Sequence, residues 1–304
     1  MEFFHQVMAC LYFGLFIPAI VLNVVTSFIS WKLKVKSAFI VYLKSLVVAD
    51  FLMTLMIPLK ALSDLPGASL GLKVLGCHIS SLFYFCLYMS IILMGLISLD
   101  RFFKIVRPAG RLLGQSALFG RVAVIIVWTL LLSVNTVPNM IFNSGKPTND
   151  SAEVCMSMKS ELGKRYHKVV TYDCFGIFLV VSAVMGLCYT CISKRVITSH
   201  RTSGSTAVEG RRKIKARVFV VLAVFLVCFA PYHIVRIFYA PTQEENKLSC
   251  HWALLKVAKS VTLWLATTNV CLDPLIYILL CKAFRDKFYE YKIFGQWTSI
   301  TTAL

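Results

Sequence analysis

Three cations lie within or beside long apolar stretches of this sequence: Lys60, Arg236 and Lys259. An arginine side chain binds a phosphate group through two parallel hydrogen bonds, and a lysine ammonium acts beside it as a point charge. A nucleotide di- or polyphosphate carries several negative charges in one compact chain, so it suits such a cluster. The alternative is that these side chains extend to lipid headgroups, as lysines near helix ends commonly do.

The neighbours of these cations include groups that can contact the rest of a nucleotide. His233, Arg236 and Tyr239 recur every three residues and therefore lie roughly on one helical face. Tyr84 and Tyr88 are four residues apart and can stack on a base or contact a ribose. Core packing is the simpler interpretation of Tyr88 alone. Three more polar side chains can read base or sugar edges: Asn139, His167 and Gln243.

Two carboxylates, Asp50 and Asp273, lie inside apolar stretches, where a charge costs about 2.5–3.5 kcal/mol on insertion scales. With Ser90 and Asn269 they form a set of oxygen donors that can share a proton or hold a small cation, and we name sodium as that cation. The alternative is a structural network that includes water. Catalysis by this pair is not expected, because no nucleophile accompanies it, and no other cofactor is predicted.

Asp100 and Arg101 are adjacent at the end of an apolar stretch. Neighbouring side chains of opposite charge can form a local ion pair, and a binding partner at this helix end can open it. The pair is therefore a candidate contact for a protein partner.

Seven apolar stretches must position all of these residues. A hydrocarbon core about 30 Å thick requires roughly 20 residues of helix, since each residue adds about 1.5 Å and backbone groups in lipid must bond internally. The stretches are residues 8–31, 41–62, 79–103, 122–142, 169–192, 218–239 and 254–280. We therefore predict an all-α membrane protein, a seven-transmembrane helix bundle that forms a single domain over residues 1–304.

Composition and charge agree with a multi-pass membrane protein. Hydrophobic residues make up 58% of the chain and charged residues 15%, unlike a soluble domain. The connections on one side hold 21 of the 32 basic residues, and that side is expected to be cytoplasmic. The N-terminus is then extracellular. The net charge of +18 indicates contact with anionic membrane lipids, and nucleic-acid binding is a poor interpretation of it.

Three of the eleven cysteines lie at or beyond the outer face: Cys77, Cys155 and Cys250. Thiols at that face oxidise. Cys77 opens the third stretch and Cys155 lies in the longest outer loop, so we predict a disulfide between them. Cys250 lacks an obvious partner unless Cys10 reaches it. The same outer loop contains a glycosylation sequon at Asn149.

Several motifs are distributed along the chain: Asn23, Leu46-Val47-Val48-Ala49-Asp50, Asp100-Arg101-Phe102, Trp128, Cys228-Phe229-Ala230-Pro231 and Asp273-Pro274-Leu275-Ile276-Tyr277. Together they resemble the rhodopsin-like (class A) G-protein-coupled receptors over essentially the whole chain. The amphipathic stretch 282–291 is similar to the membrane-surface helix eight of that family. The resemblance implies a plasma-membrane receptor that is not an enzyme. It also implies coupling to a heterotrimeric G protein through Asp100 and Arg101.

Residues 58–64 and 229–237 narrow the resemblance to the metabotropic purinergic (nucleotide) receptors. The likeness is strongest to their Gi-coupled subgroup, which senses ADP or UDP-sugars, and other segments lean toward one of its ADP receptors. This implies an extracellular nucleotide ligand, ADP in the first place, and inhibition of adenylate cyclase through Gi. It also implies a set of ligand contacts: Lys60, Tyr84, Tyr88, Asn139, His167, His233, Arg236, Tyr239, Gln243 and Lys259.

Two positions depart from that pattern. Phe238 stands where the family usually has proline, and Ser260 stands where its ADP receptors carry glutamate. These departures leave open a UDP-sugar receptor, or an orphan-type relative with a lipid or peptide ligand. A transporter or channel would show inverted repeats and helices broken at mid-membrane, and the sequence has neither. A membrane enzyme would need a catalytic constellation, which is also missing from the sequence.

Overall fold

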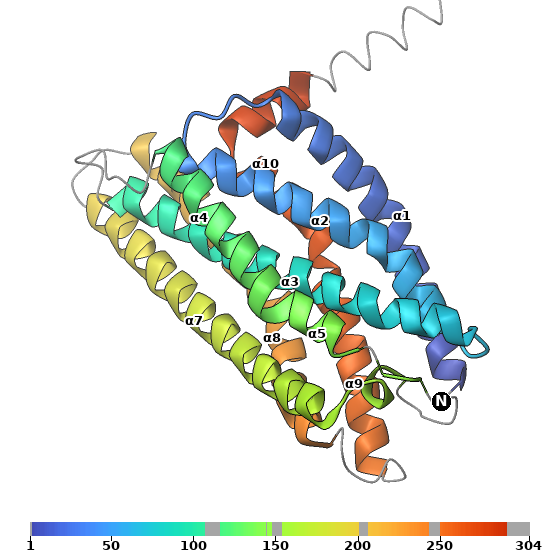
Figure 1. The fold of residues 1–304 in the computed structure, drawn as a ribbon. Coiled ribbons are helices and arrows are strands. Elements are labelled where there is room, and N and C mark those ends of the chain that lie inside the picture. The colour runs from blue at the N-terminus through green and yellow to red at the C-terminus, as the bar shows by residue number, and fades with distance from the viewer. Residues whose placement is uncertain are drawn as a thin grey trace, which may run out of the picture.

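The computed structural model describes residues 2–106, 116–143, 145–147, 154–200, 206–242 and 250–290, with side chains for all of these except 196–200 and 206–218. This part of the chain is all-α (Figure 1). Its helices are α1 (Glu2–Lys32), α2 (Ala38–Ser63), α3 (Leu70–Val106), α4 (Ala117–Leu130), η2 (Leu131–Thr136, a π-helical turn), α5 (Val137–Ile141), α6 (Val154–Ser157), α7 (Glu161–His200), α8 (Thr206–Thr242), α9 (Cys250–Thr267) and α10 (Asn269–Leu280). Residues 282–290 are also helical, as predicted for the stretch 282–291.

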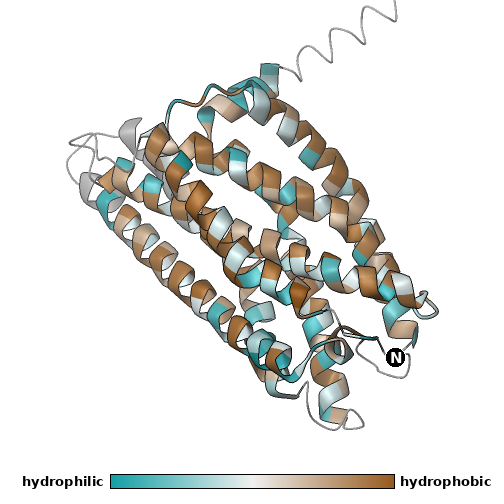
Figure 2. Ribbon diagram, viewed as in Figure 1, coloured by the Kyte–Doolittle hydropathy of each residue, from teal (hydrophilic) through white to brown (hydrophobic). Residues whose placement is uncertain are grey.

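Seven helical segments are long and apolar enough to cross a membrane: Glu2–Lys32, Ala38–Ser63, Leu70–Val106, Ala117–Ile141, Glu161–Arg195, Phe219–Thr242 and Cys250–Leu280. They confirm the seven predicted stretches, and most of them extend past the apolar run at one end or both. Helical hydrogen bonds need no apolar side chains, so the helices continue into the aqueous layer. Large apolar side chains such as Ile125, Leu130 and Val180 are exposed on the outside, which suits contact with lipid (Figure 2).

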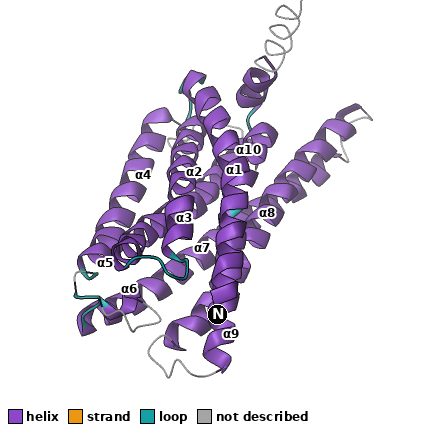
Figure 3. Cartoon of the chain, turned by 90° about the vertical axis from the view of Figure 1, so that its right-hand side faces the viewer, coloured by secondary structure: helices purple, strands orange, loops and turns teal. Residues whose placement is uncertain are grey.

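Helix α3 forms the centre of the bundle. In its most apolar window 72% of the residues are buried, against 11% in the span that contains α4, which therefore lies at the periphery. Helix α3 packs between α2 and α7. Helix α2 also contacts α1 and α4. Helix α8 lies between α7 and α9. Helix α1 reaches α9 near the N-terminus (Figure 3), where Trp264 Nε1 donates a hydrogen bond to the Leu11 carbonyl at 3.1 Å.

Pro274 leaves a carbonyl group that a polar side chain from another helix satisfies. Pro274 has no N–H, so the carbonyl of Val270, four residues earlier, lacks its helical donor. Asn23 Nδ2 on α1 donates to this carbonyl at 3.0 Å and to Thr54 Oγ1 on α2 at 3.2 Å. One buried amide thus ties three spans together. The helical run of the seventh span is interrupted at Thr268, six residues before Pro274.

Candidate ligand-binding site

A cavity of about 730 Å³ lies at the end of the bundle where α1 and α3 begin. The predicted orientation makes this the extracellular end. Its lining comes from α1, α2, α3, η2, α5, α6, α7, α8 and α9. Seven of the ten predicted contact residues line it: Lys60, Tyr84, Tyr88, Asn139, His167, Arg236 and Lys259. Side chains that are far apart in the sequence therefore meet around one space.

The other three predicted contacts are placed differently. His233 and Tyr239 are buried but do not line the cavity, and Gln243 lies outside the described residues. Three residues of an α-helix rotate the chain by about 300°, which is about 60° short of a full turn. Residues 233, 236 and 239 therefore point in directions that differ by about 60° from one to the next. When Arg236 points into the cavity, the other two point to either side. His233 instead stacks on Phe178, with ring centroids 4.1 Å apart.

Arg236 is held by neutral groups. Its Nη2 atom lies 3.1 Å from Nε2 of His167, and this nitrogen accepts the hydrogen bond because an arginine can only donate. The other ring nitrogen of His167 then carries the proton and faces Asn139 Oδ1 at 3.4 Å. Lys159 Nζ lies at the same distance, 3.4 Å, from that oxygen. A line of polar groups thus runs along the cavity wall and has a cation at each end.

Lys159 was not among the residues that the sequence predicted as ligand contacts. It lies between α6 and α7 and is 7% exposed. Burial lowers the pKa of its ammonium to about 8, because a desolvated cation is less stable than the neutral amine. The loop that contains it is fixed by the predicted disulfide between Cys77 and Cys155, which the structure contains with a Cα–Cα distance of 5.4 Å.

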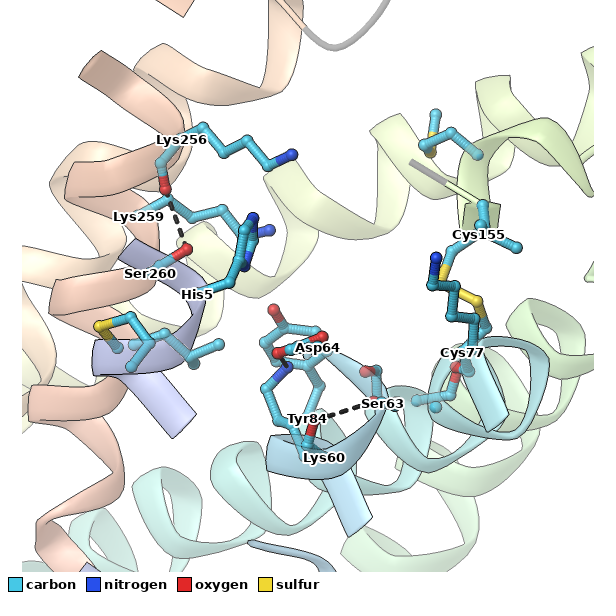
Figure 4. A pocket seen from close by; sticks show the side chains of 18 of the residues that line it. His5, Lys60, Ser63, Asp64, Cys77, Tyr84, Cys155, Lys256, Lys259 and Ser260 are labelled. Carbon is cyan, nitrogen blue, oxygen red and sulfur yellow. Dashed lines mark hydrogen bonds and ion pairs between the residues drawn. A yellow bond between two sulfur atoms is a disulfide. The ribbon is translucent and has the colours of Figure 1, made fainter. Parts of the chain in front are cut away.

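Positive charge exceeds negative charge around the cavity. Six cationic side chains line it, against the two carboxylates of Glu2 and Asp64. Asp64 contacts Lys60 at 3.0 Å (Figure 4). In the described part of the chain, no carboxylate lies within ion-pair distance of Arg236 or Lys259. The Lys259 ammonium instead lies 5.0 Å from the centre of the Tyr239 ring.

Tyr84 lines the cavity together with these cations. The Arg236 guanidinium lies 6.0 Å from the centre of its ring. The ring stacks on Tyr232, with centroids 6.3 Å apart and an interplanar angle of 21°. The site therefore combines separated cations with an aromatic wall, which suits a phosphate chain attached to a planar base.

The first turns of α1 also contribute to the wall, which the sequence did not indicate. Glu2, His5 and Tyr12 line the cavity, and Figure 4 shows His5 between the α9 lysines and Asp64. The apolar pattern of α1 predicts a span but carries no signal for which turn faces the other helices. Cys10 and Cys250 are both free and exposed, so the suggested second disulfide is not formed. The sequon at Asn149 lies outside the described residues.

A second polar cluster lies deeper, between α2, α3 and α10. Asp50 accepts hydrogen bonds from Ser90 Oγ at 3.1 Å and from Tyr277 OH at 2.6 Å. Asn269 Nδ2 donates to Asp273 Oδ2 at 2.7 Å. Within the described residues, the other carboxylate oxygen of Asp273 and the amide oxygen of Asn269 are buried without a hydrogen-bond partner. Such oxygen atoms fit the predicted sodium ion, because hard cations prefer oxygen ligands.

Asp100 and Arg101 form the predicted ion pair at the opposite end of α3. Arg101 Nη2 lies 3.1 Å from Asp100 Oδ2, and Lys104 Nζ lies 2.8 Å from the same oxygen. The Arg101 guanidinium also stacks on Phe39 of α2, 3.7 Å from the ring centre. Two cations thus share one carboxylate of the protein, and within the described residues Arg101 Nε and Asp100 Oδ1 are buried without a hydrogen-bond partner.

The two positions that depart from the subgroup pattern differ in their relation to the cavity. Phe238 is 63% exposed on the outside of α8 and does not line the cavity. Ser260 lines it, and its hydroxyl donates to the Lys256 carbonyl at 3.0 Å. Of the two, Ser260 alone is placed where it can affect a ligand directly.

Comparisons with known proteins agree with this architecture. Residues 22–277 match the family of seven-transmembrane receptors described as the rhodopsin family. Purinoceptor 13 of Homo sapiens is 41% identical over 283 residues, which cover 92% of this chain and 80% of that protein. Purinoceptor 14 of Bos taurus is 39% identical over 283 residues, 92% and 84% of the two chains. G-protein coupled receptor 87 of Mus musculus is 36% identical over 287 residues, 93% and 79%. The chain therefore belongs to the rhodopsin family of seven-transmembrane receptors, as a receptor and not an enzyme, and is related to purinoceptors 13 and 14.

Proposed function

We propose that this receptor binds an extracellular nucleotide, most specifically ADP, at the plasma membrane and activates a G protein of the Gi type, which inhibits adenylate cyclase. The observation that carries the proposal is the excess of cations around the cavity, where Arg236 and Lys259 have no carboxylate partner among the described residues. A nucleotide diphosphate supplies the missing negative charge. The relatedness to purinoceptors supports the same ligand class.

We assign the phosphate chain to Arg236, Lys259 and Lys60, which line the same cavity as Tyr84. Asn139 and His167 then face the base and ribose. Bound phosphate draws α8 and α9 toward α2 and α3, because it is attracted to cations on three of these helices at once. A ligand shifts a conformational equilibrium only by its difference in affinity between the states. In this receptor the difference in affinity comes from the cations, which lie closer to one phosphate chain when α8 and α9 approach α2 and α3.

A sodium ion at the deeper cluster belongs to the same proposal. Asp50, Ser90, Asn269 and Asp273 would hold it with carboxylate, hydroxyl and amide oxygens. The ion would supply one positive charge beside the two carboxyl groups in the buried interior of the bundle, which offsets the negative charge of one of them. Its role is to stabilise one arrangement of α2, α3 and α10.

Cells that express this chain, titrated with ADP and UDP-glucose in parallel, test the proposal. We expect saturable Gi activation by ADP that disappears in Arg236→Ala, because this change removes the bidentate phosphate ligand. Lys164→Ala is the matched control, since Lys164 pairs with Glu161 at 2.7 Å on the same face of the membrane but does not line the cavity.

The other results of this titration separate the parts of the proposal. A response to UDP-glucose alone would support the phosphate site but would make a UDP-sugar, and not ADP, the ligand. A response through a different G protein would support the ligand but not the coupling to Gi. Silence to both nucleotides, with the receptor at the cell surface, contradicts the proposal and favours a lipid or peptide ligand.

A further inference from the structure

Lys60 differs from the other two cations assigned to phosphate because it already has an anion. Its ammonium contacts Asp64 at 3.0 Å, and the Lys60 side chain is 10% exposed while that of Asp64 is 47% exposed. The two residues lie one helical turn apart at the end of α2, so the pair forms without help from another helix. Arg236 and Lys259 have no such carboxylate among the described residues.

The position of Asp64 is fixed by the end of α2. Its backbone N–H donates to the Lys60 carbonyl at 3.2 Å, and Ser63 Oγ donates to the same carbonyl at 2.8 Å. These bonds cap the helix and place Asp64 at the cavity wall. Its carboxylate therefore lies within reach of the Lys60 ammonium.

Asp64 lies on the same cavity wall as the cations assigned to phosphate. Arg236 on α8, Lys259 on α9 and Lys60 on α2 all line this cavity together with Asp64. A phosphate chain that reaches Lys60 therefore meets the Asp64 carboxylate, which contacts this ammonium at 3.0 Å. Each additional phosphate brings more negative charge toward this carboxylate.

We propose that Asp64 limits the phosphate chain that the cavity accepts, so that a nucleoside diphosphate binds and a nucleoside triphosphate is disfavoured. This inference rests on the proposed nucleotide function. A diphosphate shares Lys60 with Asp64, because its charge is largely balanced by Arg236 and Lys259. A triphosphate places further charge against the Asp64 carboxylate, and like charges at short range repel.

The test measures the potency of ADP and of the non-hydrolysable triphosphate adenylyl imidodiphosphate on Gi activation in cells. In Asp64→Asn the ratio of triphosphate potency to diphosphate potency is expected to rise about tenfold, because a half-exposed charge at short range has an effect of that order. Asp64→Glu retains the charge and is expected to retain the wild-type ratio. Asp64→Ser, which also removes the charge, repeats the measurement if Asp64→Asn does not reach the surface.

Glu2→Gln is the matched control, because Glu2 is the other carboxylate on the cavity wall and has no ion pair with Lys60. Its potency ratio should stay near the wild-type value. An unchanged ratio in both Asp64→Asn and Asp64→Ser overturns the inference while leaving the proposed function intact. Equal loss of both potencies also overturns it, since Asp64 would then act by positioning Lys60. A wild-type receptor that answers neither nucleotide overturns the proposed function and this inference together.

Discussion

Two groups of cations at opposite ends of the helix bundle differ in their partners. At the inner end, Arg101 and Lys104 both contact one carboxylate, that of Asp100, at 3.1 and 2.8 Å. At the outer end, Arg236 contacts the neutral ring nitrogen of His167. Arg236 is 8% exposed, whereas the side chains of Arg101 and Lys104 are 22% and 29% exposed, so the most buried of these cations is the one without a carboxylate. The inner cations share a carboxylate of the protein, whereas Arg236 and Lys259 have none in the described part of the chain, and an anionic ligand can supply it.

Removal of the inner arginine should give the largest effect. Arg101→Ala is expected to abolish G-protein activation while ADP affinity stays within about threefold, which is about 0.7 kcal/mol. The reason is that Arg101 lies at the other end of α3 from the cavity. Radiolabelled ADP binding and Gi activation, measured on the same membranes, check both parts. Loss of binding in a receptor that reaches the surface would show that the two ends are not separate.

Removal of one outer cation should give a smaller, graded effect. Lys259→Met is expected to lower ADP potency about ten- to hundredfold, because a hydrogen bond to a charged group contributes about 1.5–3 kcal/mol. The substitution keeps a side chain of similar length against Tyr239. Lys164→Met is the control on the outer surface. If both variants shifted the ADP titration equally, the effect would be general surface charge and not a site.

The charge of Lys159 on the cavity wall can be changed by pH, so its contribution to ADP affinity can be measured without a mutation. The pKa of Lys159 is lowered to about 8, so the side chain is mainly charged at pH 7 and mainly neutral at pH 9. Lys159 faces Asn139, on the side assigned to the base and ribose, but the negative charge of a ligand in the same cavity still favours the charged form of Lys159. ADP affinity should therefore fall about three- to tenfold over this interval. Lys159→Arg, which stays charged, should remove that pH dependence. Affinity that falls equally in both proteins would assign the effect to another group.

The smallest effect is expected on the lipid-facing side of α8. Phe238→Ala should change ADP potency by less than about threefold, because the side chain is 63% exposed and makes no part of the cavity wall. A dose–response curve for ADP measures this. A large shift would mean that the lipid-facing surface of α8 takes part in activation.

The sequence predicts the fold better than it predicts the walls of the cavity. Long apolar runs identify the seven spans because the bilayer sets both their length and their helicity. Cys77 and Cys155 could be paired from their location alone. Spacing on one helix was less informative, since three-residue steps rotate the side chain and leave His233 and Tyr239 beside the cavity. Some cavity residues whose position depends on how separate elements pack were missed.

Lys159 and His5 illustrate these missed contacts. Lys159 reaches the cavity because the disulfide holds its loop against α3, and no local pattern encodes that position. His5 reaches it because α1 approaches α9 near the N-terminus. In both cases the residue type is suited to an anionic ligand, but only the tertiary arrangement brings it to the site.

The most direct test of the central claim is equilibrium binding of radiolabelled ADP to purified receptor, wild type and Arg236→Ala, with Lys164→Ala beside them. If the outer cations need an external anion, wild type and Lys164→Ala bind ADP with equal affinity. Arg236→Ala then binds at least about a hundredfold more weakly, as expected when a bidentate charged contact of roughly 3 kcal/mol is lost. Equal ADP affinity in all three proteins would contradict the claim and place the nucleotide elsewhere.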